Sequence, residues 1–270
     1  MSDPIVVAGG LAARAELGWR DRSGELHAVA FTPLVIDETV VAALPFDQTA
    51  TAQALADAAR ATLVLSDSRM AWSGWSPLAQ PVHVVVTPDR QGDWTWSGAL
   101  DQEVRKYAPS RLMIDTAIQR REHWWYLPRW IVRLQPAGPV TGIARRGGPD
   151  DAVLFEEGPD ALRATTVAVD DWLADEIHVT ELDRRDRLGE GPVRALAFTH
   201  DFSVPDMERT STFAAVGVRT GGRLVVGARH GTPTLEEPLG LVRRLARHWR
   251  RERACRSALA SYDTDSVSAT

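Results

Sequence analysis

The sequence predicts a mainly β fold with flanking helices, built as two related barrel-like halves. Short apolar runs alternate with turn signals along most of the chain, which is typical of strands. In addition, "ELGWRDRSGELHAVAFTP" (residues 16–33) resembles "ELDRRDRLGEGPVRALAFTH" (residues 181–200). If Gly191 and Pro192 are set aside, both segments share Glu-Leu, Arg-Asp-Arg, Gly-Glu and Ala-x-Ala-Phe-Thr. The match predicts an internal duplication.

The first half is expected to be a strand meander followed by a helix. Strand patterns cover AELGWRD, ELHAVAFTPLVI and TVVAALPF, separated by the turn signals "DRSG" and "DE". Ala52, Leu55, Ala56 and Ala59 recur at helical spacing, which predicts a helix across one end of a barrel. Residues 63–65, VHVVVTPD and WYLPRWIVRLQPAG are further strand candidates, and Pro128 in the last one indicates an edge or a bulge. Residues 100–121 are charged and compatible with a helix.

The second half is expected to begin after "ARRGGPDD", which combines charges, paired glycines and a proline. This boundary divides the chain into residues 1–145 and a shorter half, residues 146–270. Strand patterns follow at DAVLFEE, ATTVAVDDW and EIHVTELD, and FAAVGVRTGGRLVVGARHG predicts a hairpin whose "TGG" turn supplies a positive φ. We expect residues 16–44 to superpose on residues 181–227.

The last element is predicted to be a helix with one apolar and one arginine-rich face. Leu239, Val242, Ala246 and Trp249 share the face expected to dock, while the arginines are either solvated or bind an anionic partner. Cys255 is the one cysteine, so no internal disulfide is possible, and its position in this helix favours a structural thiol.

Composition excludes several functional classes. The net charge of -5 argues against a broad nucleic-acid surface, which would need a basic face. No window approaches the roughly 20 apolar residues that cross a bilayer, so we expect no membrane partner. The N-terminal residues lack the pattern of a signal peptide, which leaves a cytoplasmic location as the expectation. Nucleotide-binding glycine loops, the nucleophile elbow and the H-E-x-x-H motif are absent from the sequence.

The order of elements over residues 12–134 resembles the FMN-binding split-barrel superfamily, the pyridoxamine 5'-phosphate oxidase-like proteins. The resemblance is carried by the strands LGWRDRSGE, LHAVAFTPLVI and TVVAALP, the turn "DQTATA", the helix QALADAAR and the strands ATLVLSD and VHVVVTPD. It implies a split β-barrel and a redox protein that binds FMN and acts on a small organic substrate. Members usually work as homodimers with cofactor clefts between barrels, so two halves in one chain would form an internal pseudo-dimer.

The resemblance also implies where a flavin phosphate would bind. The family holds it beside the turn that leads into the first helix, which here offers Gln48, Thr49 and Thr51. This turn has no lysine or arginine, and a phosphate is best held by cations. Arg69 or Arg60 is therefore expected to supply the charge, or else a residue of the second half. The alternative is that the threonines only cap the helix.

A second branch of the superfamily binds haem through an axial histidine. The seven histidines form no pair at metal-ligand spacing, so no zinc site is expected. His123, next to Trp124 in "HWWYLPRW", would line an aromatic pocket, and His200 and His230 are the other candidate ligands. The many tryptophans either fill the core or stack on a ring system. Flavin, deazaflavin, haem and a cofactor-free binding or accessory protein all remain open from sequence.

Overall fold

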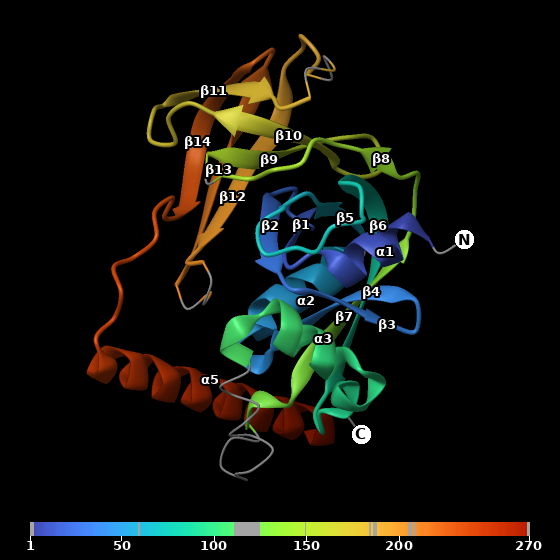
Figure 1. The fold of residues 1–270 in the computed structure, drawn as a ribbon, viewed down its shortest axis with the longest axis vertical. Helices are drawn as coiled ribbons and strands as arrows, with labels where there is room; N and C mark the ends of the chain where they lie inside the picture. Colours follow the sequence, from blue (N-terminus) through green and yellow to red (C-terminus); the bar gives the residue numbers. More distant parts are fainter. Residues whose placement is uncertain are drawn as a thin grey trace.

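The computed structural model describes residues 3–58, 60–110, 125–148, 150–183, 185, 188–204, 207 and 209–268. A curled sheet built from the first half lies below a closed barrel built from the second half, and a long helix lies at the opposite end of the sheet (Figure 1). Among the described residues the sheet has eight strands and the barrel six. The predicted fold class, mainly β with flanking helices and two barrel-like halves, is confirmed.

The sheet of the first half is antiparallel throughout. Its strand order is β2-β1-β5-β6-β7-β4-β3, and β8 pairs with β6. Pro128 was expected at an edge or a bulge, but it lies immediately before β7, an inner strand between β6 and β4. The strands are β1 (Ala15–Arg20), β2 (Leu26–Phe31), β3 (Pro33–Ile36), β4 (Thr39–Pro45), β5 (Arg60–Leu65), β6 (Leu78–Asp89), β7 (Arg129–Pro136) and β8 (Thr141–Gly142).

Short helices cover the sheet. Lys106, the single lysine of the chain, ends α3 and is buried, and its ammonium group donates to the carbonyl oxygens of Gly9 and Pro33. These two bonds join α3 to the end of α1 and to β3. Burial, with a contribution from Arg105, lowers the pKa of Lys106 to about 7. The helices are α1 (Pro4–Leu11), the 3-10 turn η1 (Phe46–Gln48), α2 (Thr49–Ala58), the 3-10 turn η2 (Asp93–Ser97) and α3 (Ala99–Lys106).

The barrel of the second half consists of two three-strand meanders. Strands β9 to β11 form one and β12 to β14 the other, and the pairs β9–β12 and β11–β14 close the ring. Gly221 turns β13 into β14 with a φ of +54°, which confirms the predicted "TGG" hairpin. The strands are β9 (Asp151–Glu156), β10 (Arg163–Val169), β11 (Glu176–Glu181), β12 (Val193–Phe202), β13 (Thr210–Thr220) and β14 (Arg223–Gly231).

The repeated segments adopt different structures, so the expected superposition of residues 16–44 on 181–227 is wrong. In the first segment β1 and β2 pair as a hairpin. In the second segment β11 ends at Glu181, the first matched residue, and β12 begins at Val193, so the described residues between them form no strand in place of β1. β12 does match β2, but it pairs with β9 and β13. The sequence match therefore predicted the second strand of each copy correctly, but not the first strand of the second copy and not the pairing.

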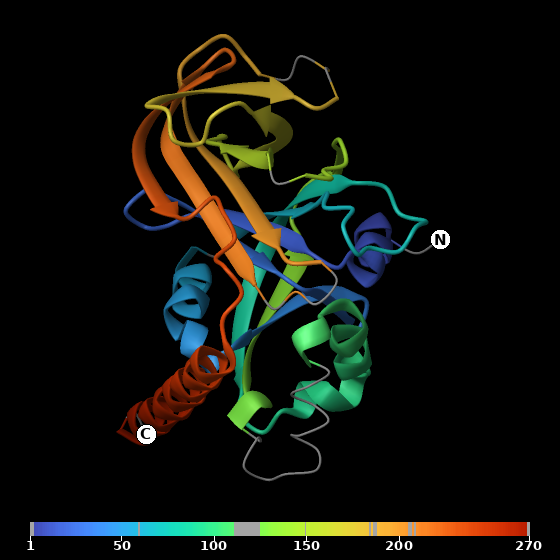
Figure 2. The ribbon, with the colours of Figure 1, turned by 60° about the vertical axis from the view of Figure 1, so that its left-hand side comes forward.

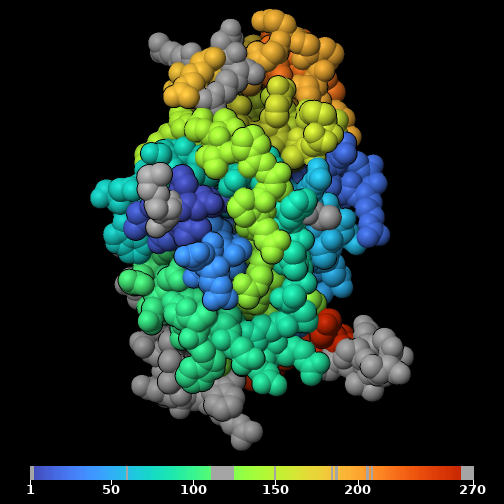
Figure 3. All heavy atoms as spheres, turned by 90° about the vertical axis from the view of Figure 1, so that its right-hand side faces the viewer, coloured from blue at the N-terminus to red at the C-terminus, as the bar shows by residue number. Residues whose placement is uncertain are grey.

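The two halves meet along a close-packed seam. Phe155 of β9 is fully buried against Gly18 of β1, where an added Cβ would lie 2.5 Å from the ring. Nearby, the Thr62 hydroxyl donates to the carbonyl oxygen of Leu162 over 2.6 Å. Figure 3 shows the face on which the yellow-green chain after β7 runs from the sheet to the barrel. The seam holds the halves in one arrangement through an apolar cluster that draws on both.

The C-terminal helix α5 (Leu241–Ser268) returns to the first half and lies below α2 (Figure 2). Cys255 is 3% exposed there, and Ala258, Leu259 and Tyr262 pack against the core of the sheet. The predicted docking face is wrong, because Val242 and Trp249 are 79% and 64% exposed. None of the helices in the described part of the chain is long and apolar enough to cross a membrane.

Candidate functional site

A polar hollow of about 460 Å³ lies where the sheet, the barrel and α5 meet; we call it the polar cleft. The first half lines it with parts of β2 to β4, η1 and α3, the barrel adds residues of β12 and β13, and α5 adds one arginine. Its volume is within the range of small-molecule sites. The charged and aromatic residues that line it include Arg14, Glu103, Tyr107, Tyr126, Arg129, His200 and Arg251.

Arg129 is the unusual group of the polar cleft. The side chain is 1% exposed and its guanidinium lies 4.0 Å from the centre of the Tyr126 ring. Among the described residues, Nε and Nη2 have no hydrogen-bond partner, and Glu103 Oε1 is 3.9 Å from Nη2. Buried guanidinium nitrogens are normally bonded, so this group calls for an anion or ordered water.

Arg14 and Arg251 add two more cations from distant parts of the chain. Arg14 lies between the rings of Tyr107 and Phe202, at 5.6 and 5.8 Å, and its Nε has no hydrogen-bond partner among the described residues. Arg251 reaches the cleft from α5 and contacts Asp47, with Nε 3.2 Å from Oδ2. The cleft thus brings together three arginines and suits a negatively charged group.

Glu103 is held on the cleft wall by two hydroxyl groups. Its Oε1 accepts hydrogen bonds from Ser110 at 2.7 Å and from Tyr126 at 2.8 Å. Burial and the neighbouring Glu103 carboxylate raise the pKa of Tyr126 well above its usual value, so this phenol stays protonated and donates. The wall is therefore a fixed hydrogen-bonded unit beside Arg129.

Of the residues predicted to hold a phosphate, some line the polar cleft and others are bonded elsewhere. Gln48 and Thr51 line the polar cleft. The Thr49 hydroxyl is used inside the protein, because it donates to the Phe46 carbonyl oxygen and accepts from Trp130 Nε1. Helix α2 begins at Thr49, so neither threonine caps a helix that starts at Ala52.

Arg69 lies in a buried charge network at the seam and not at the turn. It bonds Asp67 and, at 2.6 Å, Asp201 Oδ1 of the barrel. His200 belongs to the same network, with Nε2 2.9 Å from Asp67 Oδ2 and Nδ1 3.1 Å from Glu16 Oε1. Both imidazole nitrogens therefore face carboxylates, and neither is placed to bind an iron. Arg146 pairs with Glu16 on the other side.

Burial sets the protonation of this network. It lowers the pKa of His200 to about 4, against the opposing effect of the Asp67 carboxylate. Burial acts to raise the pKa of Asp67, but hydrogen bonds from His200 and Arg69 hold it below its usual value. At neutral pH the neutral imidazole donates from Nε2 to an ionised Asp67. The network fixes the barrel on the sheet.

The remaining predicted residues do not meet in the polar cleft. His230 is on β14, away from the cleft. His123 and Trp124 lie outside the described residues. Arg60, the other cation considered for the phosphate, lies at the start of β5 and lines a different hollow. Of the tryptophans, Trp75, Trp94, Trp125 and Trp130 are buried, whereas Trp72 is 43% and Trp96 88% exposed.

One cluster in the described chain has metal-ligand chemistry. Asp21, Glu25 and His27, in the β1–β2 turn, place their ligand atoms within 4.8 Å of one another. However, Asp21 already accepts from Ser23, from the Glu25 backbone and contacts His27 Nε2 at 2.9 Å. These hydrogen bonds stabilise the turn and explain why the three side chains lie close together, so we assign no metal to them.

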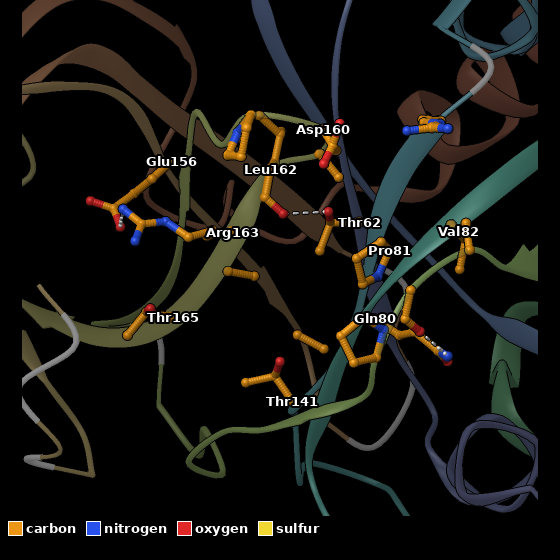
Figure 4. Close-up of a pocket in the computed structure, with 18 residues that line it drawn as sticks. Thr62, Gln80, Pro81, Val82, Thr141, Glu156, Asp160, Leu162, Arg163 and Thr165 are labelled. Atoms are coloured by element: carbon orange, nitrogen blue, oxygen red, sulfur yellow. Dashed lines mark hydrogen bonds and ion pairs between the residues drawn. The ribbon is translucent and has the colours of Figure 1, made fainter.

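A second hollow, of about 540 Å³, lies at the seam beside the inner strands β5 and β6 (Figure 4). Alanine, proline, valine and leucine make up much of its wall; we call it the seam cavity. Its side chains come from both halves, and the bond between Thr62 and Leu162 joins one half to the other there. The seam thus leaves two hollows of opposite character, one polar and one apolar.

Comparison with known proteins finds two distant solved structures. No protein-family model and no curated protein matches the chain. HutZ, the heme storage protein from Vibrio cholerae, is 10% identical, with a TM-score of 0.36 over 51% of this chain and 91% of HutZ. A protein of unknown function from Agrobacterium tumefaciens is 16% identical, with a TM-score of 0.34 over 50% of this chain and 53% of its own length. Likenesses this distant carry no argument about function.

The three arginines of the polar cleft were not predicted. Arg129 carried a usable signal, because it is the one charge in the otherwise apolar and aromatic stretch WYLPRWIV. A lone arginine in such a strand must be paired or functional. Arg14 and Arg251 carried none, since only tertiary structure brings residues 237 positions apart together.

Proposed function

We propose that the polar cleft binds a planar cofactor with an anionic group, and that FMN fits it better than haem. The observation that carries the proposal is the buried Arg129 guanidinium, whose Nε and Nη2 have no hydrogen-bond partner among the described residues. A phosphate beside Arg129 would accept hydrogen bonds from Nε and Nη2 and would neutralise the buried guanidinium charge. Arg14 and Arg251 add charge, and Gln48 and Thr51 add neutral hydrogen-bonding groups.

Haem propionates are also anions, so the histidines decide between the two cofactors. His200 is the histidine that lines the polar cleft in the described part of the chain, and both its nitrogens face carboxylates. Of the other candidate ligands, His230 is on β14 and does not line the cleft, and His123 is outside the described residues. This favours a flavin, which needs no ligand to a metal.

With FMN bound, the protein would be a redox enzyme of the FMN-binding split-barrel superfamily. The flavin would supply electron or hydride transfer to a small organic substrate. The chain's own part would be to bind the phosphate through its arginines, to orient the ring against Tyr107 and to keep Tyr126 protonated. Flanking groups of the sheet and barrel would exclude water.

The test compares FMN with riboflavin, which lacks the phosphate, by flavin fluorescence titration. We expect FMN to bind at least about tenfold more tightly than riboflavin, and Arg129→Met to abolish that difference. Arg133→Met is the matched control, since Arg133 is on the same strand and lines a different hollow. Equal binding of both flavins by the native protein contradicts the proposal.

A hemin titration separates the alternatives. A Soret band that shifts when His123 is replaced, without FMN binding, would make haem the cofactor. Absence of binding by FMN, a deazaflavin and hemin would favour the cofactor-free binding or accessory protein.

A further inference from the structure

We propose that the seam cavity is a second binding site, for a small molecule with an apolar body and a carboxylate. It is distinct from the polar cleft, and the inference does not depend on the function proposed for that cleft. The cavity measures about 540 Å³, within the range of ligand sites. Protein interiors are otherwise closely packed, so a hollow of this size between two docked halves leaves room for a small molecule.

The wall of the seam cavity is built to keep the space open. From the sheet it takes Pro81, Val82 and Ala137, and from the barrel Ala161 and Leu162. These side chains are small or rigid, so they do not fill the cavity. Next to it, by contrast, the large Phe155 ring fills the seam against Gly18. Figure 4 shows Thr62 between Leu162 of the barrel half and Pro81 of the sheet.

Several polar groups of the wall are bonded within the protein. Thr62 is 2% exposed and its hydroxyl donates to Leu162, while the Gln80 amide nitrogen donates to the Gly138 carbonyl oxygen at 2.9 Å. Gln80 Oε1 has no hydrogen-bond partner among the described residues, so the wall offers a ligand one buried acceptor. Beyond it, a ligand rich in hydrogen-bonding groups would find few partners and would lose its hydration. The interior therefore selects an apolar body, such as an alkyl chain.

Charge at the cavity favours one anionic group on that ligand. Arg60 and Arg163 line it, and the Arg163 side chain is 58% exposed. Glu156 contacts Arg163 over 3.4 Å, but it is also paired with the buried Arg219. With Glu156 offset by Arg219, two arginines face one further carboxylate, Asp160, which leaves one net positive charge. A carboxylate is the simplest partner for it.

Decanoate and decan-1-ol test the proposal by isothermal titration calorimetry. They share the apolar chain and differ in the charged group. We expect both to bind, decanoate about tenfold more tightly, and the double variant Arg60→Gln/Arg163→Gln to remove that preference while it leaves decan-1-ol unchanged. Ala161→Trp should abolish binding of both by filling the cavity. Ala254→Trp, on the exposed face of α5, controls for an added indole.

Three results would overturn the proposal. The native protein binds neither probe at millimolar concentration, Ala161→Trp binds them like Ala254→Trp, or Arg129→Met reduces decanoate binding, which would place the probe in the polar cleft. If Ala161→Trp lowers the melting temperature, Pro139→Trp fills the space from the other wall and gives the same test. None of these results depends on whether FMN binds, so the proposal for the seam cavity and the proposal for the polar cleft can be rejected independently.

Discussion

Gly18 and Phe155 are in direct contact across the seam, and the ring of Phe155 occupies the position that a side chain at residue 18 would need. An added Cβ would lie 2.5 Å from two ring carbons, and the ring is fully buried, so it has no free space to move into. The close approach of β1 to β9 thus requires glycine at this position.

Replacing Gly18 with alanine is expected to destabilise the protein by about 1–3 kcal/mol, the usual effect of overpacking. Urea unfolding followed by far-UV circular dichroism measures this. The double variant Gly18→Ala/Phe155→Leu should recover part of the loss, because leucine vacates the ring position. Gly142→Ala is the control, since a Cβ there meets nothing within 4 Å. Unchanged stability of Gly18→Ala would mean that the seam adjusts freely.

The buried network makes stability depend on pH. The pKa of His200 falls from 6.5 to about 4 on folding, so the unfolded chain binds the proton more strongly between these values. Its contribution is complete above pH 6.5 and is lost as the pH falls towards 4, by roughly 3 kcal/mol in all. Urea midpoints measured from pH 7 to 4 should fall less steeply in His200→Gln than in the native protein. Parallel curves would contradict a lowered pKa of His200 in the folded protein.

Arg129 is expected to contribute little to stability. Arg129→Met removes a buried charge, and the Glu103 carboxylate 3.9 Å away keeps its hydrogen bonds from Ser110 and Tyr126. Stability should therefore stay unchanged or rise by about 1–2 kcal/mol. Thermal unfolding of the ligand-free protein measures this effect. Arg146→Met is the contrasting variant, since Arg146 pairs with Glu16 and bonds Ser66; its loss should cost about 3 kcal/mol or more. Nη1 of Arg129 already donates to the Pro128 carbonyl oxygen at 3.2 Å, so a large loss in Arg129→Met would show that Nε and Nη2 are bonded within the protein as well.

Docking of α5 can be followed through Cys255. The thiol is 3% exposed, and burial raises its pKa, so it should react slowly with Ellman's reagent in the folded protein. Tyr262→Ala removes ring contacts with Phe46 and Trp130, at 6.3 and 5.2 Å, and should speed the reaction about tenfold or more. Trp249→Ala, on the exposed face, should react like the native protein. Fast labelling of the native protein would mean that α5 undocks readily.

Much of the fold could be predicted because strand periodicity and turn chemistry act locally. The "TGG" turn is a case, since two glycines favour a tight turn of the backbone. Strand pairing could not be predicted in the same way. β2 and β12 are the matching strands of the repeat at residues 16–33 and 181–200, yet β2 pairs with β1, its neighbour in sequence, whereas β12 pairs with β13 and with the more distant β9.

The candidate site was harder to predict for the same reason. Gln48 and Thr51 were found because they flank a recognisable turn before a helix. The cations come from an N-terminal loop, the start of β7 and the last helix, and no local pattern relates Arg14 to Arg251. His200 was one of three candidate haem ligands because of its residue type, but in the structure its two nitrogens face Glu16 and Asp67.

Because α5 supplies Arg251, the polar cleft is completed late in the synthesis of the chain. The sheet that forms most of the cleft is finished when residue 142 leaves the ribosome, but its last wall follows more than a hundred residues later. The whole barrel of the second half is made in between. A ligand held by all three arginines can therefore bind only after translation has passed residue 251, so such a ligand cannot assist the folding of the nascent chain before that point.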